Sequence, residues 1–233
     1  MPSNWIKGFT KHTHPSVLKI SETMKHKKLD NFYHWREEAK KKGLIKSHYP
    51  SFNKDGDFAE LLGVVYGDGN IEKFPNTERL VIAANSNNTG FISRYADIVQ
   101  KIFNKKPTLI RSRVANSLRI SIYENHISKR LGIPTGNKKD IIIVVPIWIK
   151  KERYLLKRFL RGLYEAEGSF CVHKPTSTYK FLFKNTNRYL LDAVQNGLIM
   201  LGFHPHRSTN QIQISRKREV YDCMELLEFR KYK

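Results

Sequence analysis

Two segments of the sequence, 99 residues apart, repeat one pattern of small residues and an acid. The first reads LLGVVYGDG over residues 61–69 and the second LRGLYEAEG over residues 160–168. Small residues lie four positions apart in each, Gly63 and Gly67 in the first and Gly162 and Ala166 in the second. A glycine inside a helix costs up to about 1 kcal/mol, so its repetition predicts close approach of a second helix. The simplest partner is the helix of the other copy.

An acid follows each small pair, Asp68 in the first copy and Glu167 in the second. Both fall in the last turn of a predicted helix, where an acid opposes the negative end of the helix dipole. If the helices pack through their small faces, the two carboxylates emerge together and repel each other unless a cation lies between them. A hard divalent ion such as Mg²⁺ resolves that repulsion. One copy would indicate a core helix with a capping acid, whereas two copies favour a metal site.

The charge of the chain indicates its partner. There are 42 Lys and Arg against 21 Asp and Glu, a net charge of +21, which points to a nucleic acid. No apolar run reaches the length of a membrane span, and the first residues lack the apolar core of a signal peptide. We therefore expect an intracellular protein, cytoplasmic or organellar, without a membrane partner. A divalent ion beside a phosphodiester suggests metal-assisted hydrolysis.

Three segments are predicted. Residues 1–50 form a basic extension with 11 Lys and Arg, four acids and one helix at about 29–43. Either a solvated tail or a DNA-gripping arm fits that composition. Residues 51–145 and 146–233 each alternate helices with pairs of strands, which predicts an α+β fold of two duplicated halves. The predicted strands lie near 70–73, 79–84, 108–114, 117–123, 169–172, 179–184, 203–207 and 211–215.

Over about residues 55 to 230, the duplicated pattern resembles the monomeric, double-motif LAGLIDADG homing endonucleases. The second copy, FLRGLYEAEGSF at 159–170, is a close match, and the first, ending YGDGN at 66–70, is nearly as good. The resemblance implies αββαββα halves related by a pseudo-twofold axis, with saddle-shaped antiparallel sheets in the major groove of a long DNA site. It also implies site-specific cleavage of both DNA strands, leaving 3′ overhangs, in intron homing by a monomer.

The resemblance also implies roles for individual residues. Asp68 and Glu167 match the metal-binding acids of the family, and the backbone carbonyls of Gly67 and Ala166 match positions that assist them. Mg²⁺ is the implied cofactor, with Mn²⁺ as a substitute and Ca²⁺ supporting binding without cleavage. Basic and amide side chains are expected to complete the active site: Lys138 in a Gly-x-Lys loop, Lys184 and Asn85 at strand ends.

Polar residues alternate with apolar ones along the predicted strands, so one face of each sheet should meet the DNA groove. Arg119 and Ser121 alternate with isoleucines in the first half, and Gln211 and Gln213 do so in the second. Such side chains can contact base edges or phosphates, and both remain open. The predicted DNA contacts are Arg79, Asn85, Arg111, Arg113, Arg119, Ser121, His173, Lys180, His206, Gln211 and Gln213.

A second function class stays open. A non-catalytic nucleic-acid binder could use the same scaffold, either as a maturase that binds its host intron RNA or as a DNA-binding regulator. The presence of both Asp68 and Glu167 favours the endonuclease, because a pure binder has no need for two acids at one point.

Overall fold

The computed structural model describes residues 7–27, 30, 32–44, 46–112, 114–138 and 141–232, and the chain divides into two compact units, Met1–Tyr49 and Pro50–Lys233. The first unit contains α1 (Pro15–His26) and α2 (Tyr33–Lys41) among its described residues. The sequence predicts only one helix there, at 29–43, which corresponds to α2. The prediction of a single helix is wrong, because α1 precedes it. Val17, Ile20 and Met24 recur at helical spacing in α1, but none of its residues is buried.

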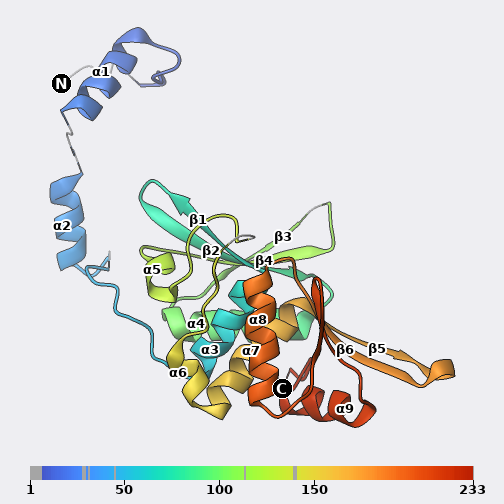
Figure 1. Ribbon diagram of the computed structural model, residues 1–233. Coiled ribbons are helices and arrows are strands. Elements are labelled where there is room, and N and C mark those ends of the chain that lie inside the picture. The colour runs from blue at the N-terminus through green and yellow to red at the C-terminus, as the bar shows by residue number, and fades with distance from the viewer. Residues whose placement is uncertain are drawn as a thin grey trace. The chain divides into compact units, whose positions relative to one another are not determined.

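The second unit, here called the body, repeats one order of elements (Figure 1), which confirms the α+β class and the two similar halves. The elements of the first half are α3 (Gly56–Gly67), β1 (Gly69–Phe74), β2 (Thr77–Asn85), α4 (Thr89–Phe103), β3 (Thr108–Arg111), β4 (Ser117–Glu124) and α5 (Ile127–Leu131). A short helix, α6 (Ile147–Lys151), precedes the second half. That half contains α7 (Arg153–Glu167), β5 (Gly168–His173), the 3₁₀ turn Lys174–Thr176, β6 (Thr178–Lys184), α8 (Arg188–Met200), β7 (His206–Ser208), β8 (Gln211–Ile214) and α9 (Lys217–Leu226).

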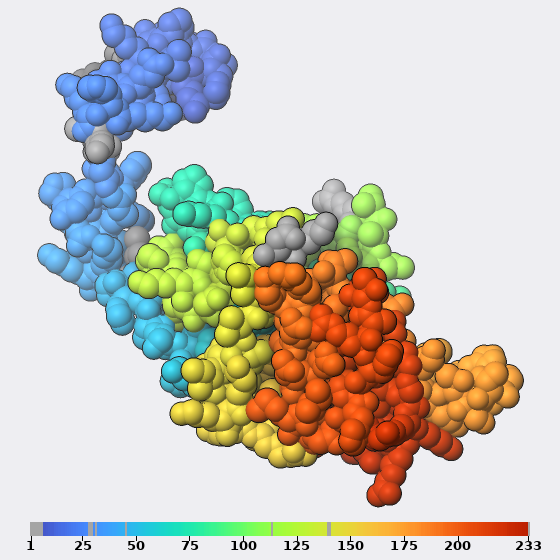
Figure 2. Space-filling view, in the orientation of Figure 1, coloured from blue at the N-terminus to red at the C-terminus, as the bar shows by residue number. Residues whose placement is uncertain are grey.

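Each half builds one antiparallel sheet of four strands, in the orders β1-β2-β4-β3 and β5-β6-β8-β7. Apolar side chains cover one face of each sheet: Leu80 and Ile82 pair with Ile122 and Ile120 across β2 and β4 and are buried. We call the opposite face of each sheet its outer face. The β5–β6 hairpin projects from the body, in light orange in Figure 2.

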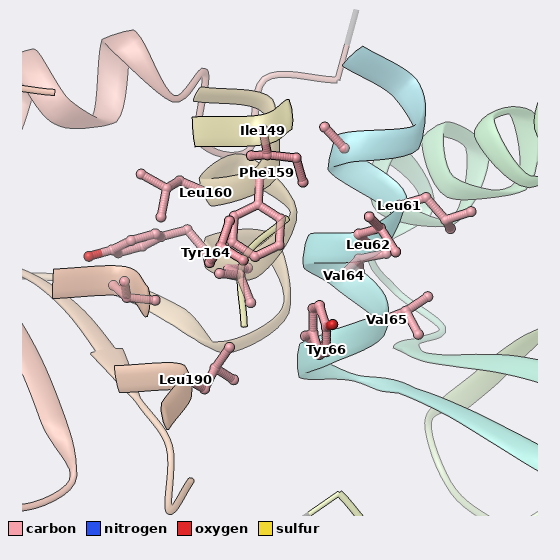
Figure 3. Packing of buried hydrophobic residues seen from close by; sticks show 14 of the residues in the cluster. Leu61, Leu62, Val64, Val65, Tyr66, Ile149, Phe159, Leu160, Tyr164 and Leu190 are labelled. Atoms are coloured by element: carbon pink, nitrogen blue, oxygen red, sulfur yellow. The ribbon is translucent and has the colours of Figure 1, made fainter. Parts of the chain in front are cut away.

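The helices α3 and α7 lie against each other at the centre of the body. A Cβ added to Gly63 would come within 2.2 Å of the Phe159 carbonyl oxygen, and one added to Gly162 within 2.1 Å of the Glu60 carbonyl oxygen. Because only glycine permits this approach, the two backbones meet at the positions that the sequence pattern predicts. Buried side chains such as Val64 and Leu160 surround the crossing (Figure 3).

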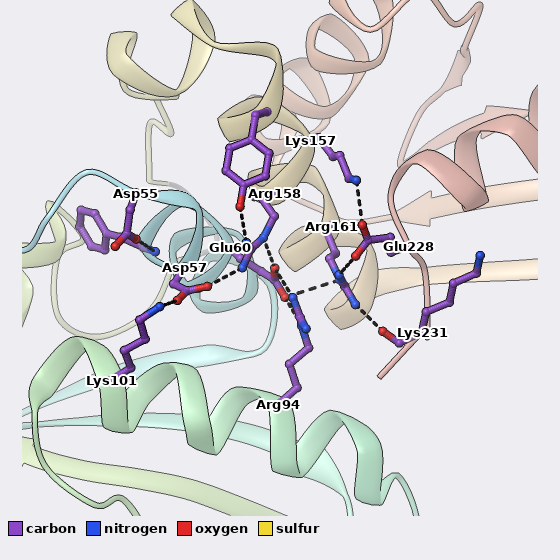
Figure 4. Close-up of polar contacts among 12 residues, drawn as sticks. Asp55, Asp57, Glu60, Arg94, Lys101, Lys157, Arg158, Arg161, Glu228 and Lys231 are labelled. Carbon is purple, nitrogen blue, oxygen red and sulfur yellow. Dashed lines mark hydrogen bonds and ion pairs between the residues drawn. The ribbon is translucent and has the colours of Figure 1, made fainter. Parts of the chain in front are cut away.

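A buried ion-pair cluster joins the two halves near the N-terminal end of α3 (Figure 4). The side chain of Glu60 is fully buried and accepts from Arg94 of the first half, at 2.6 and 2.9 Å, and from Arg158 of α7, at 2.6 Å. Arg158 also donates to Asp57, at 2.7 Å. Arg161 contacts Glu60 at 3.6 Å. The acids of this cluster on α3 thus pair with arginines of α7.

Some element boundaries differ from the prediction. The strand predicted at 108–114 ends at Arg111, and the strand predicted at 203–207 is the shorter β7, His206–Ser208. The helix α6 was not predicted; it begins directly after Pro146, whose fixed backbone angle suits a helix start. None of the described helices is both long and apolar enough to span a bilayer.

Candidate active site and nucleic-acid interface

The two predicted acids lie at matching helix ends. Asp68 is the C-terminal cap of α3, and Glu167 is the last residue of α7. A Cβ on Gly67 would lie 2.4 Å from the Cβ of Ala166, so the helix ends touch one residue before the acids. Loss of hydration, followed by the charge of Glu167, raises the pKa of Asp68 to about 6. Desolvation likewise raises the pKa of Glu167.

Lys138 brings a positive charge to this pair of acids. Its Nζ donates to the carbonyl oxygens of Tyr66 and Gly67, at 3.1 Å each, and also contacts the carbonyl of Val65. Burial lowers the pKa of Lys138 to about 8, an effect that Asp68 and Glu167 oppose. The charge of Lys138 in turn favours the ionised form of both acids. The structure therefore places Lys138, Asp68 and Glu167 in one electrostatic cluster.

The oxygen donors in this cluster fit a Mg²⁺-type ion. Such ions bind through one or two carboxylates and take their remaining ligands from water and substrate phosphates. Asp68 and Glu167 supply two carboxylates at the ends of rigid helices, with the carbonyls of Gly67 and Ala166 in the same last turns. Within the described part of the chain, no group of three or more His, Cys, Asp or Glu forms a denser metal site. This donor set suits a catalytic ion better than a closed structural one.

Asn185 contacts Glu167, although the sequence pattern did not single it out. Its Nδ2 donates to Glu167 Oε1 at 3.1 Å. The predicted candidate, Lys184, precedes it as the last residue of β6, and its side chain is exposed on the outer face of the sheet. In the first half, the side chain of Asn85 accepts from the Asn87 backbone N–H at 2.9 Å, which closes a turn before α4.

The register of the first sheet brings Arg79, Asn85 and Arg119 to the outer face. Arg79 pairs with Tyr123, and Asn85 pairs with Ser117, two positions from Arg119. Ser121 shares this face, but it is only 1% exposed and its hydroxyl has no hydrogen-bond partner among the described residues. The hydroxyl of Ser121 is therefore shielded, whereas Arg119 is open to a ligand.

Arg111 lies apart from that group. It pairs with Leu118, whose side chain packs on the core, so the register places Arg111 on the helix side of β3. Arg111 is among the DNA contacts predicted from the sequence, but the structure does not bring it together with Arg119. Arg113 lies outside the described residues.

The second sheet gathers every DNA contact that the sequence predicts for its half. Cross-strand pairs set His206 opposite Gln213, Gln211 opposite Lys184, and Lys180 opposite Cys171. His173 lies on the same face at the end of β5, where its Nδ1 is 2.7 Å from Thr176 Oγ1. The Nε2 of Gln211 donates to Gln213 Oε1 at 3.2 Å, so the two amides hold each other in place.

Two aromatic residues on the outer face of the first sheet, Phe74 and Tyr123, are not among the contacts predicted from the sequence. Phe74 is 39% exposed and Tyr123 is 41% exposed, and the guanidinium of Arg79 lies 5.7 and 5.5 Å from their ring centres. Arg79 also donates to Glu72 at 2.8 Å and to the Tyr123 hydroxyl at 3.0 Å. Tyr123 continues the alternation of Arg119 and Ser121, so the same period of two could have identified it.

Comparison with known proteins identifies the domain type. Residues 155–232 match the model of the LAGLIDADG-like domain. A segment of 130 residues, 50% of this chain, is 32% identical to the replication factor C small subunit of Methanocaldococcus jannaschii and spans only 7% of that protein.

The fold is shared with solved structures. The homing endonuclease I-DmoI aligns with a TM-score of 0.51 and 20% identity, over 74% of this chain and 94% of that one. Full-length DUF199/WhiA from Thermatoga maritima aligns with a TM-score of 0.53 and 15% identity, over 78% of this chain and 58% of that one. The N-terminal LAGLIDADG domain of DUF199/WhiA aligns with a TM-score of 0.51 and 15% identity, over 77% and 86% of the chains. The body of this chain therefore shares the fold of I-DmoI and of the N-terminal LAGLIDADG domain of DUF199/WhiA, and residues 155–232 in its second half match the LAGLIDADG-like domain.

Proposed function

We propose that this protein is a site-specific double-strand DNA endonuclease that requires a divalent metal ion. The observation that carries the proposal is the meeting of Asp68, Glu167 and Lys138 at the ends of α3 and α7, with the pKa of Asp68 raised to about 6. Two acids that desolvation destabilises in this way create a site whose charge a cation relieves.

Double-stranded DNA is the proposed substrate. The outer faces of both sheets present arginine, lysine, histidine and glutamine side chains, and the chain carries a net charge of +21. I-DmoI, which shares the fold, has been crystallised with DNA and Mn and with its target DNA in the presence of Mg. Two such sheets placed in the major groove would read a long site, and we propose that the protein does so as a monomer.

We assign a separate role in cleavage to each residue of this site. Asp68 and Glu167 would hold the ion, and the amide of Asn185 orients one oxygen of Glu167. Lys138 places an ammonium group beside both acids, where it attracts the phosphodiester and stabilises negative charge that develops on it. When bound, a Mg²⁺-type ion supplies Lewis acidity to the phosphodiester. Mn²⁺ is proposed to replace Mg²⁺, and Ca²⁺ to support DNA binding without cleavage.

The finer features of the proposal concern the biological setting. They are 3′ overhangs at the cut, a role in intron homing, and an intracellular location, cytoplasmic or organellar. Because DUF199/WhiA shares the fold to a similar degree, the acids and not the fold carry the proposal of catalysis. A non-catalytic binder of DNA or of host intron RNA is the competing function.

The deciding experiment works without a defined target sequence. The purified protein is incubated with a complex duplex DNA library and Mg²⁺, every new DNA end is sequenced, and Asp68→Asn is run in parallel. We expect recurrent double-strand breaks centred on one long motif, absent with Asp68→Asn. Retention of one DNA sequence or of a structured RNA without any cut would refute the endonuclease and establish the binder.

A further inference from the structure

Asn187, in the second half of the body, contacts the backbone of the loop that carries Lys138, here called the Lys138 loop. It is the N-cap of α8, and its Oδ1 accepts from the backbone N–H groups of Tyr189, at 2.9 Å, and Leu190, at 3.2 Å. Its Nδ2 donates to the backbone carbonyls of Lys138 and Ile141, at 2.9 Å each. One side chain therefore caps a helix and holds the backbone of Lys138.

The chemistry of this position fits asparagine alone among the usual N-cap residues. A side-chain amide has two donor hydrogens and an oxygen that accepts two hydrogen bonds, and Asn187 uses all four while only 4% exposed. Aspartate or serine would cap the helix equally well. Neither supplies two donors, so capping does not explain why an amide stands here.

A second contact connects Asn187 to Glu167 through Asn185. Its backbone N–H donates to Asn185 Oδ1 at 2.8 Å, and Asn185 Nδ2 donates to Glu167 Oε1 at 3.1 Å. On the other side, Lys138 Nζ reaches the carbonyls at the end of α3, next to Asp68. The loop that carries Lys138 is also held by Gly136, whose N–H donates to the Ile71 carbonyl of β1 at 3.0 Å. A continuous set of hydrogen bonds thus runs from Glu167 through two asparagines to Lys138.

The first half provides an internal comparison. Asn88 is the N-cap of α4, where its Oδ1 accepts from the Phe91 N–H at 3.3 Å. Its side chain also forms a hydrogen bond with that of Tyr232, near the end of the chain and far in sequence from Lys138. Asn88 therefore shares the capping role of Asn187 without the contacts to the Lys138 backbone.

We infer that Asn187 is a positioning residue for cleavage, fixing Lys138 beside the two acids through the backbone carbonyls of Lys138 and Ile141. The inference rests on the proposed endonuclease activity for its functional meaning, while the anchoring itself is a property of the folded chain. Partners of this kind, one step removed from the reacting groups, change activity by about 10–100-fold when they are removed.

The test uses the full chain with Asn187→Asp and Asn187→Ser, which keep the N-cap acceptor and remove both amide donors. Asn88→Asp is the matched control, and melting temperatures establish that each variant folds. Both Asn187 variants should lower kcat for target DNA by about 10–100-fold with an unchanged Kd for the DNA. Asn88→Asp should leave both constants unchanged.

A second readout does not depend on cleavage. The rate of Lys138 acetylation by an amine-reactive ester is measured by peptide mass spectrometry, with Lys157, which pairs with Glu228, as the internal reference. Release of the loop should speed acetylation of Lys138 in both Asn187 variants and leave Lys157 unchanged. If the wild-type protein cleaves no DNA, the proposed function fails, and this acetylation contrast alone decides the anchoring.

Three results would overturn the inference. One is a kcat within twofold of wild type in both folded Asn187 variants. Another is an equal loss in Asn88→Asp, which would assign the effect to capping. The third is an unchanged acetylation rate at Lys138.

Discussion

At the end of α3, desolvation and the charge of Glu167 raise the pKa of Asp68 to about 6, from an ordinary value of 3.8. The folded protein therefore binds the Asp68 proton more tightly than the unfolded chain does. Between these two values, the free energy of unfolding falls as the pH rises, because folding must retain a carboxylate that is poorly hydrated. Asp68 thus weakens the metal-free fold at neutral pH.

Asp68→Asn should raise the melting temperature of the metal-free protein at pH 7. This gain in melting temperature should shrink as the pH falls through 6. It should vanish below about 4, where the Asp68 carboxyl is protonated in both the folded and the unfolded protein and is therefore as neutral as asparagine. Thermal melts in the presence of a chelator, from pH 4 to pH 8, measure it. Asp222→Asn on the exposed side of α9 is the control and should show no such trend; a pH-independent difference for Asp68→Asn would contradict the prediction.

Lys138→Met should lower cleavage by about 10²-fold or more while the Kd for DNA changes little, because it removes one preorganised charge from the reacting centre and no groove contact. Single-turnover cleavage and equilibrium binding separate the two effects. Lys151→Met on α6 serves as the matched lysine control. Equal losses of binding and cleavage would instead make Lys138 a phosphate contact.

Among the elements, the crossing of α3 and α7 depends on two glycines. Gly162→Ala should destabilise the body by about 1–3 kcal/mol or more, because the new Cβ would lie 2.1 Å from the Glu60 carbonyl oxygen and force the helices apart. Gly197→Ala is the control: its Cβ would meet the movable side chain of Leu160 at 3.1 Å, and alanine favours the helix by up to about 1 kcal/mol. Urea unfolding of both variants measures the contrast. Equal stabilities would refute the close-packing explanation.

Some helices and strands were predictable from the sequence, and others were not. Local patterns sufficed for α3, α7 and β4, because repeated glycines mark a close helix pair and alternation marks the two faces of a strand. Arg111 was misplaced because the face of β3 depends on its register with Leu118 across the sheet. Asn185 was not predicted, because the residue that contacts Glu167 depends on where β6 ends. The strand ends at Lys184, and the contact comes from the next residue.

For the molecule as a whole, charge is the main property beyond the fold. The first 50 residues carry 11 Lys and Arg and four acids, and we predict that deletion of residues 1–49, the first compact unit, weakens DNA binding and flattens its dependence on salt. Binding measured from 50 to 200 mM salt tests this. The melting temperature of the deleted protein controls for damage to the body. An unchanged salt slope would show that the extension makes no phosphate contacts.

The buried cluster around Glu60 makes the two halves unequal partners. At the positions 99 residues away, the second half has Phe159 in place of Glu60, and the first half has Ala59 and Leu62 in place of Arg158 and Arg161. Two copies of the first half would bury a pair of carboxylates without the arginines of α7, and two copies of the second would set arginines against each other. The halves are therefore complementary in charge, because the acids lie on α3 and their arginine partners lie on α7. A symmetric dimer of either half alone would therefore lack the ion pairs that α3 and α7 make with each other in this chain.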